Sequence, residues 1–201
     1  ADNDSPQLSA DRLEYTLGNL RGYGFADGDT VRAFYEDLTI WQDEAGRPEL
    51  AFRTPGTACA FAEAALKTAR IYVADEDRFA MQALADLLAD ALARGVLEED
   101  DLYGTEPLVI QRLEADSVSA ARWRRFRRFC RLERSADPPE GGIWYRFPAK
   151  LRYIDPLAVG RGRASRLDAG VRQAQESFLA TDFSLWIGVP EDAIPEEDTV
   201  S

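Results

Sequence analysis

The sequence predicts an α+β protein that is predominantly α-helical in its first two thirds, with a short β-hairpin, and β-rich in its C-terminal third. Through residues 9–134, apolar side chains recur every three or four positions, which is typical of amphipathic helices. Two short runs of β-favouring residues, 38–41 and 49–52, interrupt this pattern, and after residue 134 the alternation becomes strand-like. Helices followed by strands around one more helix indicate the α+β class.

The composition is typical of a soluble globular chain. A length of 201 residues suits one domain, or one domain with an appendage. The net charge of −12 does not favour nucleic acid or an anionic membrane as a partner. No apolar run of about 18 residues is present, so no membrane-spanning helix is expected. The two cysteines, Cys59 and Cys130, imply no disulfide framework, and a cytoplasmic location is expected.

The first helix is expected over residues 9–21, after a flexible lead-in at residues 1–8. Ser9 is a good N-cap, because its hydroxyl can accept a hydrogen bond from the first turn of the helix. Leucines recur behind it at helical spacing, and glycines end the helix. The leucines are Leu13, Leu17 and Leu20, and the glycines are Gly22 and Gly24.

The rest of the helical part, to residue 134, is expected to contain the hairpin and further helices. A short helix capped by Asp29 or Thr30 precedes the hairpin, whose turn is at residues 43–46. The helix expected at residues 75–94 is apolar over more than a narrow stripe, so we expect it to be the central core helix. The other helices are expected from Thr54 or Thr57 to about 72, through 108–113, and from Asp116 or Ser117 onward.

The C-terminal part, residues 135–189, is expected to contain most of the strands, and residues 190–201 are expected to form an acidic, frayed tail. Alternation extends back before this part, so the first of these strands is expected to begin at residue 129. The expected elements are strands at 129–133 and 142–154, a loop at 160–166, a helix from Ser165 or Asp168 to about 180, and a buried strand at 183–187.

The first helix carries a polar stripe beside its apolar one. Asp11, Tyr15 and Asn19 are spaced four residues apart, so a carboxylate, a phenol and an amide share one helix face. An ordinary amphipathic helix, with an acidic first turn that complements the macrodipole, is one interpretation of this pattern.

The segment 10–17, Ala-Asp-Arg-Leu-Glu-Tyr-Thr-Leu, resembles the segment with the last metal ligand of HD-domain metal-dependent phosphohydrolases. The resemblance implies that Asp11 binds a divalent metal (Mn, Mg, Fe or Ni), and that Tyr15 and Asn19 line the substrate pocket. The order of elements resembles that of the deoxynucleoside triphosphate triphosphohydrolase branch of this family. In that branch, basic and tyrosyl side chains on a pair of helices after a short hairpin face the nucleotide. The resemblance implies that Arg70 and Tyr72 of this chain face the substrate in the same way. The segment 152–157 resembles a late Arg-x-x-Asp-Pro segment of small HD-domain proteins.

The sequence contains no histidine, so the other three metal ligands of that family are not among these residues. Either they lie in an N-terminal half that is removed, disordered or on another chain, or the chain comes from a lineage without catalysis, or the resemblance is accidental. We expect the substrate-side portion of a phosphohydrolase that acts on a nucleotide or phosphate ester. It is expected to be inactive alone, with no catalytic residue assigned, and to complete its site with the missing half or in a homo-oligomer.

An arginine-rich segment, residues 122–131, is the only concentration of positive charge. Its aromatic residues and Cys130 fall at spacings that predict a core-facing stripe, with the arginines on the solvent side. The arginines can pair with acidic groups of the protein or of a partner, bind a phosphate, or bind nucleic acid. A non-catalytic scaffold or regulatory module that uses this face is the alternative function. The aromatic residues are Trp123, Phe126 and Phe129.

Overall fold

A computed structural model describes residues 5–138 and 140–194. The chain forms two compact units that interleave in the sequence, whereas the sequence pattern predicts a sequential division at residue 134. Unit 1 comprises Ala1–Val73 and Lys150–Thr181, and unit 2 comprises Ala74–Ala149 and Asp182–Ser201. Helices dominate and the sheets are small, so the α+β class is confirmed. No helix in the described part of the chain is long and apolar enough to cross a membrane.

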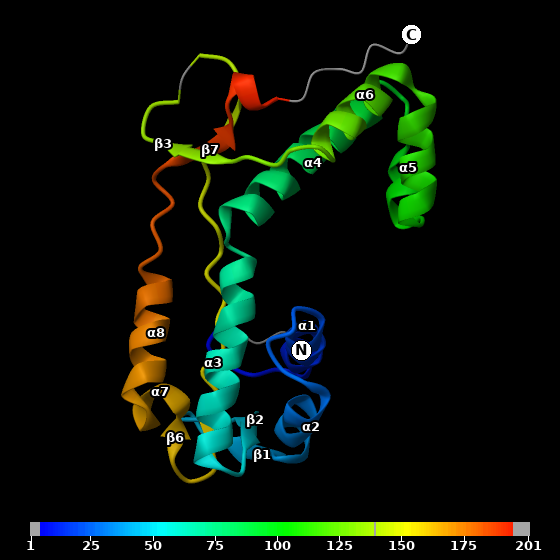
Figure 1. The fold of residues 1–201 in the computed structure, drawn as a ribbon. Helices are drawn as coiled ribbons and strands as arrows, with labels where there is room; N and C mark the ends of the chain where they lie inside the picture. Colours follow the sequence, from blue (N-terminus) through cyan, green and yellow to red (C-terminus); the bar gives the residue numbers. More distant parts are fainter. Residues whose placement is uncertain (1–4, 139, 195–201) are drawn as a thin grey trace. The chain divides into compact units, whose positions relative to one another are not determined.

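Unit 1 is built around one sheet and a central helix (Figure 1). The strand order of the sheet is β1-β2-β5-β6, in which the β1–β2 hairpin is antiparallel and β2 pairs with β5 in parallel. The elements are α1 (Ala10–Gly22), α2 (Gly28–Glu36), β1 (Leu38–Gln42), β2 (Pro48–Phe52), α3 (Pro55–Ile71), β5 (Leu157–Ala158), β6 (Gly162–Arg163), α7 (Ala164–Leu167) and α8 (Ala169–Leu179).

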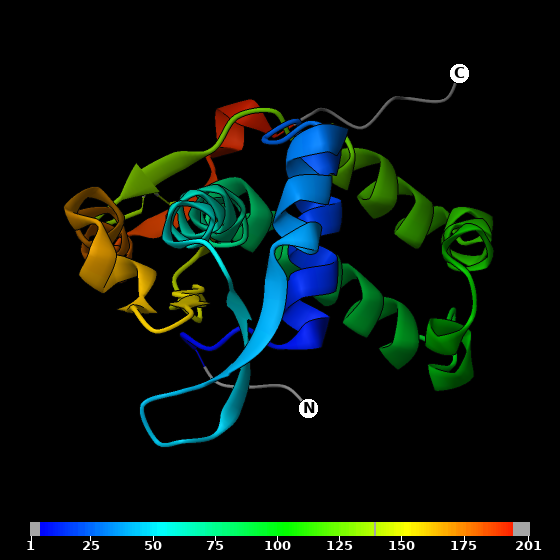
Figure 2. The same ribbon diagram turned by 90° about the horizontal axis from the view of Figure 1, so that it is seen from below.

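Helix α3 is the centre of unit 1 and lies between α1 and α8 (Figure 2). Small side chains let neighbouring elements approach it closely, and three phenylalanine rings fill the space beside it. Phe61 on α3 lies 5.0 Å from the Phe52 ring and 5.4 Å from the Phe34 ring, centroid to centroid. The buried residues of α3 are Ala58, Phe61, Ala62, Ala64, Ala65, Leu66, Thr68 and Ala69.

The described part of unit 2 contains the α-helices α4, α5 and α6 and a small antiparallel sheet of strand order β3-β7-β4. One apolar cluster lies between α4, α5 and α6, and a second joins Phe79 of α4 to Ile187 and Val189 of β7. The elements are α4 (Asp75–Ala93), a 3-10 helix η1 (Glu99–Tyr103), α5 (Glu106–Ala115), α6 (Ser117–Phe126), β3 (Glu133–Ser135), β4 (Ile143–Tyr145), β7 (Trp186–Val189) and η2 (Glu191–Ala193).

Several expected elements differ from the structure. The strand expected at 129–133 is replaced by β3, which begins at residue 133, and the strand expected at 142–154 is reduced to β4. Each is short because it pairs with β7 over only three residues. The C-terminal third is therefore less β-rich than expected. The central helix is α3 rather than α4, and the expected loop at 160–166 contains β6 and part of α7.

The chain ends lie partly outside the described residues. Of the expected lead-in, residues 5–8 are described, and Leu8 is 1% exposed in the core of unit 1. The backbone N–H of Leu8 donates to Glu49 Oε1 at 3.0 Å. Of the expected tail at 190–201, residues 195–201 lie outside the described part.

Candidate functional site

The polar stripe of the first helix forms as expected, and its residues have different surroundings. Ser9 caps α1 by accepting a hydrogen bond from Arg12 N at 3.3 Å. Asp11 is exposed, whereas Tyr15 and Asn19 are half-buried. The Asn19 side-chain amide donates to the phenol oxygen of Tyr72, at the end of α3.

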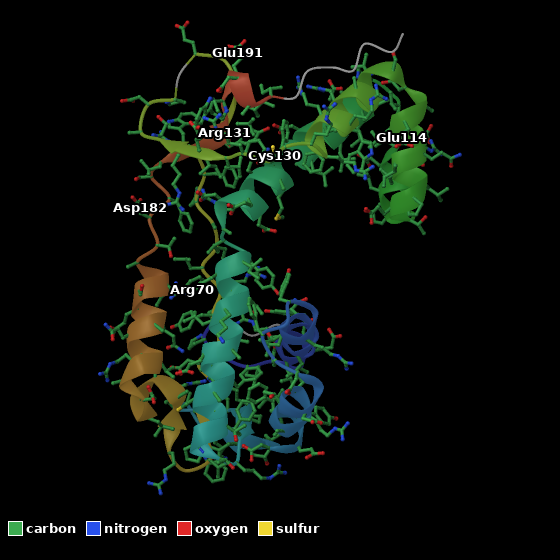
Figure 3. The ribbon with its side chains drawn as sticks, in the orientation of Figure 1. Arg70, Glu114, Cys130, Arg131, Asp182 and Glu191 are labelled. Carbon is green, nitrogen blue, oxygen red and sulfur yellow. The ribbon has the colours of Figure 1, made fainter. Side chains whose placement is uncertain are left out.

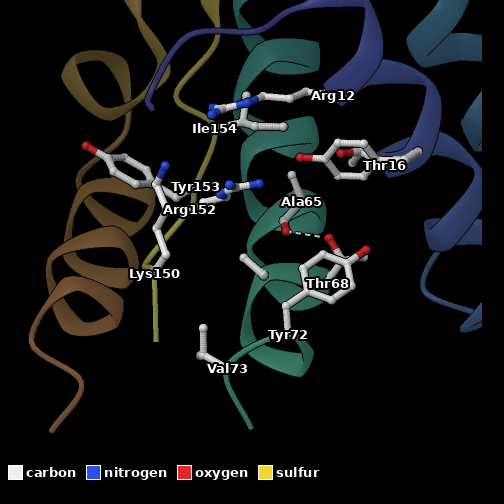
Figure 4. Close-up of a pocket in the computed structure, with 12 residues that line it drawn as sticks. Arg12, Thr16, Ala65, Thr68, Tyr72, Val73, Lys150, Arg152, Tyr153 and Ile154 are labelled. Atoms are coloured by element: carbon white, nitrogen blue, oxygen red, sulfur yellow. Dashed lines mark hydrogen bonds between the residues drawn. The ribbon is translucent and has the colours of Figure 1, made fainter. Parts of the chain in front are cut away.

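A cavity of about 280 Å³ opens beside Tyr15 and Tyr72, entirely within unit 1 (Figure 4). Its walls are α1, α3 and the extended segment 150–154, which returns to this site from the far end of the sequence. Its lining residues are Arg12, Tyr15, Thr16, Ala65, Thr68, Ala69, Tyr72, Val73, Lys150, Arg152, Tyr153 and Ile154.

The charged side chains that line the cavity are all cationic. They are Arg12, Lys150 and Arg152, and no aspartate or glutamate occurs among the described lining residues. Arg12 is 4% exposed, and its Nη1 donates to Ser5 Oγ and to the carbonyl of Gln7, each at 3.3 Å. The site is therefore locally positive in a chain of net charge −12.

Lys150 and Arg152 are exposed at the mouth of the cavity, and neither side chain forms a hydrogen bond or ion pair with another described residue. Both lie on the segment 150–154, and Arg152 extends toward α3 (Figure 4). An anion that enters here does not have to displace a carboxylate from either cation. Both side chains are thus available to pair with an anionic ligand.

The phenols of the cavity are hydrogen-bond donors. Burial raises the pKa of Tyr72, which outweighs the opposing effect of its hydrogen bond with Asn19. Burial, and then the charge of Asp155, raise the pKa of Tyr153. Both phenols are therefore neutral near pH 7. Because Asn19 donates to the Tyr72 oxygen, the Tyr72 proton is left for a ligand.

The segment 150–154 is held by contacts at its C-terminal end. Asp155 N donates to the Pro6 carbonyl at 2.9 Å, and Tyr153 N donates to Ser5 Oγ at 3.3 Å. The Asp155 carboxylate accepts from Ser165 N at 2.9 Å and from Ser165 Oγ at 2.5 Å. The two charged residues of the Arg-x-x-Asp-Pro segment thus have different roles: Arg152 lines the cavity, and Asp155 holds the backbone in place through its hydrogen bonds.

Arg163, the last residue of β6, forms a buried ion pair. Its guanidinium donates to both oxygens of Glu49, at 2.7 and 2.9 Å, and to Glu44 at 3.1 and 3.2 Å. Burial by itself lowers the pKa of Arg163, but the hydrogen bonds to Glu49 and Glu44 outweigh burial and raise it. Arg163 therefore links β6 to the hairpin.

Arg70 lies away from the cavity. It is on the side of α3 that faces α8 (Figure 3), and its Nη2 is 3.5 Å from the carbonyl of Ala174. Of the other residues that the sequence assigned to substrate binding, Tyr15 and Tyr72 line this cavity, and Asn19 does not line it but bonds to Tyr72. Sequence reasoning missed four lining residues: Arg12, Lys150, Arg152 and Tyr153. Three of these belong to the motifs that carry the resemblance, which was the available signal: Arg12 in 10–17, and Arg152 and Tyr153 in 152–157.

Asp11 does not line the cavity, although the resemblance implies that it binds a metal. Among residues 5–138 and 140–194, no group of three or more His, Cys, Asp or Glu side chains could hold a metal ion. A single exposed carboxylate does not fit a divalent metal, which takes several protein ligands or bound phosphates. We therefore assign no metal-dependent reaction step to the described residues.

The arginine-rich segment lies in unit 2, and its helix is shorter than expected. Because α6 ends at Phe126, Cys130 does not continue the core-facing stripe and is exposed (Figure 3). Trp123 and Phe126 do pack against the cluster around Leu87 and Leu113. Part of the charge is paired within the protein, as in the bond of 2.7 Å between Arg122 and Asp90.

Comparison with known proteins gives no match to any protein-family model, and no curated protein or solved structure is significantly similar to the chain.

Proposed function

We propose that unit 1 binds a phosphate ester or a nucleotide in the cavity between α1, α3 and residues 150–154. The observation that carries this proposal is the set of three cations, Arg12, Lys150 and Arg152, around a cavity of about 280 Å³ with no carboxylate among its described lining residues. A net charge of −12 makes such a local excess of positive charge notable. In this proposal the chain is the substrate-side portion of an HD-type phosphohydrolase.

A phosphate group matches the donors of this cavity. Arginine offers a planar fork to two phosphate oxygens, and lysine adds a mobile point charge. Arg12 is fixed by its bonds to Ser5 and Gln7, whereas Lys150 and Arg152 are exposed and can close on an entering ligand. The preorganised Arg12 lowers the entropic cost of binding a small anion, whereas ordering Lys150 and Arg152 adds to that cost.

The other lining residues suit an organic group attached to the phosphate. Ala65, Ala69, Val73 and Ile154 give the cavity apolar walls, and the phenols of Tyr15, Tyr72 and Tyr153 add aromatic surface. The Tyr72 hydroxyl donates to an acceptor on the ligand, and Asn19 fixes its orientation. Arg70 is not part of this site.

For this chain we propose binding of the phosphate ester, and not its hydrolysis. The described residues supply no group that could hold a metal, and the chain has no histidine. Metal-dependent hydrolysis would require ligands from outside the described residues, so no residue here is assigned a catalytic role.

Arg152→Gln tests the proposal. We expect this variant to bind a nucleoside monophosphate about tenfold more weakly, because a hydrogen bond to a charged group contributes roughly 1.5–3 kcal/mol. Isothermal titration calorimetry measures the affinity. Arg172→Gln is the matched control, since Arg172 is an exposed arginine of unit 1 on α8, outside the cavity. Equal losses in the two variants would mean that only net charge matters, and would contradict the proposal.

A further inference from the structure

Unit 2 contains a second cavity that the proposed function does not use. It has a volume of about 180 Å³ and lies between α4, α6 and β4. Three aromatic side chains, Phe126, Phe129 and Tyr145, contribute to its walls. Its remaining lining residues are Ala83, Asp86, Leu87, Arg122, Arg125 and Ile143.

Two of the three charged groups in this cavity already have partners. Asp86 accepts from Gln82 Nε2 at 2.8 Å and from the Tyr145 hydroxyl at 2.7 Å, so each carboxylate oxygen has a donor. Burial, and then the hydrogen bond to Asp86, raise the pKa of Tyr145, so this phenol stays protonated. Arg122 is paired with Asp90 at 2.7 Å.

Arg125 is the third charged group and differs from the other two. It is half-buried, and its side chain forms no hydrogen bond or ion pair with another described residue. Partial burial removes some hydration from its guanidinium without supplying a counter-charge. Arg125 is therefore the one charged group among the described lining residues that has no hydrogen-bonded partner, and it lies beside aromatic walls.

We infer that this cavity binds a small aromatic carboxylate, with its carboxylate on Arg125 and its ring among Phe126, Phe129 and Tyr145. A guanidinium holds a carboxylate by two parallel hydrogen bonds, and aromatic rings pack favourably at an offset or edge-on. The volume of about 180 Å³ lies below the roughly 300–1,000 Å³ of sites for drug-sized ligands, which favours a single ring over a nucleotide.

The charge balance favours a carboxylate over a phosphate monoester. A carboxylate carries one negative charge and neutralises Arg125. A phosphate monoester carries close to two negative charges at pH 7, and the second would face the Asp86 carboxylate in the same cavity. The two cavities are therefore proposed to bind different classes of ligand: a phosphate ester in unit 1 and an aromatic carboxylate in unit 2.

Fluorobenzoate, followed by fluorine NMR on the full chain, tests the inference. We expect saturable binding to the wild type, about tenfold weaker binding to Arg125→Gln, and unchanged binding to Arg124→Gln. Arg124 is the matched control, because it is an exposed neighbour on α6 that does not line the cavity. Far-UV circular dichroism checks that both variants keep the helical content of the wild type.

Three results would overturn the inference: no saturable binding to the wild type at millimolar probe, equal weakening in both variants, or tighter binding of phenyl phosphate than of benzoate. A nucleoside monophosphate added to saturation should leave the fluorobenzoate signal unchanged, since it belongs to the other cavity. Displacement by the nucleotide would contradict a separate site in unit 2. The outcome does not depend on whether the cavity of unit 1 binds phosphate esters.

Discussion

The hydrogen bond between Asn19 and Tyr72 leaves the hydroxyl proton of Tyr72 available to a ligand. The Asn19 amide donates to the Tyr72 oxygen, so the Tyr72 proton is not used in this bond and can be donated to a ligand. The sequence placed Asn19 and Tyr15 on one helix face, but it could not show that the end of α3 meets this face. A contact between residues 53 positions apart is set by tertiary packing rather than by local spacing.

Tyr72→Phe should reduce affinity for a nucleoside monophosphate by roughly five- to tenfold, because one hydrogen bond contributes about 1 kcal/mol or somewhat more when its acceptor is charged. Calorimetric titration measures the change. Stability should change little, since Tyr72 is 36% exposed. Tyr103→Phe, at a residue that is 90% exposed in unit 2, is the control and should bind like the wild type. An unaltered affinity in Tyr72→Phe would remove this phenol from the site.

Glu49 belongs to the buried ion pair of unit 1, and we expect Glu49→Leu to destabilise the protein by about 3–5 kcal/mol. The change leaves Glu44 as the only carboxylate bonded to Arg163 among the described residues, beside the Asp155 carbonyl, and it removes the acceptor of the Leu8 N–H. Urea unfolding followed by circular dichroism measures the loss. Glu44→Gln should cost much less, because the Glu44 side chain is 45% exposed, against 2% for Glu49. Similar losses from the two changes would show that burial of the pair is not what matters.

At the scale of elements, local signals predicted helices better than strands. Ser9, Asp116 and Asp168 each cap a helix through a side-chain hydrogen bond, and all three were among the expected caps. The alternation in residues 142–154 predicted one long strand, but only β4 finds a partner in β7. The remainder has the polar and apolar pattern of a strand, and yet Lys150, Arg152 and Ile154 line a cavity. The alternation of polar and apolar residues predicts which side chains are buried, but it does not show which strand, if any, pairs with the segment.

The cap of α6 gives a pH-dependent prediction. Hydrogen bonds from the Ser119 backbone, and then from Arg94, lower the pKa of Asp116 from 3.8 to about 2. A lowered folded-state pKa stabilises the folded protein fully above pH 3.8, and this contribution is lost as the pH falls toward 2. Carboxyl NMR titration should give the lowered value. In Asp116→Asn, which keeps an acceptor without the charge, stability should depend less on pH between 4 and 2 than in the wild type. An ordinary pKa for Asp116 would contradict this account of the cap.

At the scale of the whole molecule, the sequence was sufficient for the fold class and for the helix that forms one wall of the cavity, although of its predicted residues only Tyr15 lines that cavity. The wall made by α1 could be predicted because its caps, spacing and motif are local. The opposite wall, residues 150–154, is separated from α1 by unit 2 in the sequence, and no local pattern reports that return. The identification of α4 as the central helix was wrong for a related reason. Apolar residues around α4 are shared between two clusters of unit 2, whereas the alanine-rich α3 is the helix enclosed by other elements.

The most direct test of the proposed function compares adenosine monophosphate with adenosine on the wild-type chain by isothermal titration calorimetry at low ionic strength. The two ligands share their base and sugar, so the difference in affinity reports the phosphate alone. We predict that the monophosphate binds at least about tenfold more tightly, and that added salt reduces this difference by screening the exposed cations Lys150 and Arg152. Equal affinities for the two ligands, or a difference that is undiminished in Arg152→Gln, would contradict the assignment of this cavity to a phosphate ester.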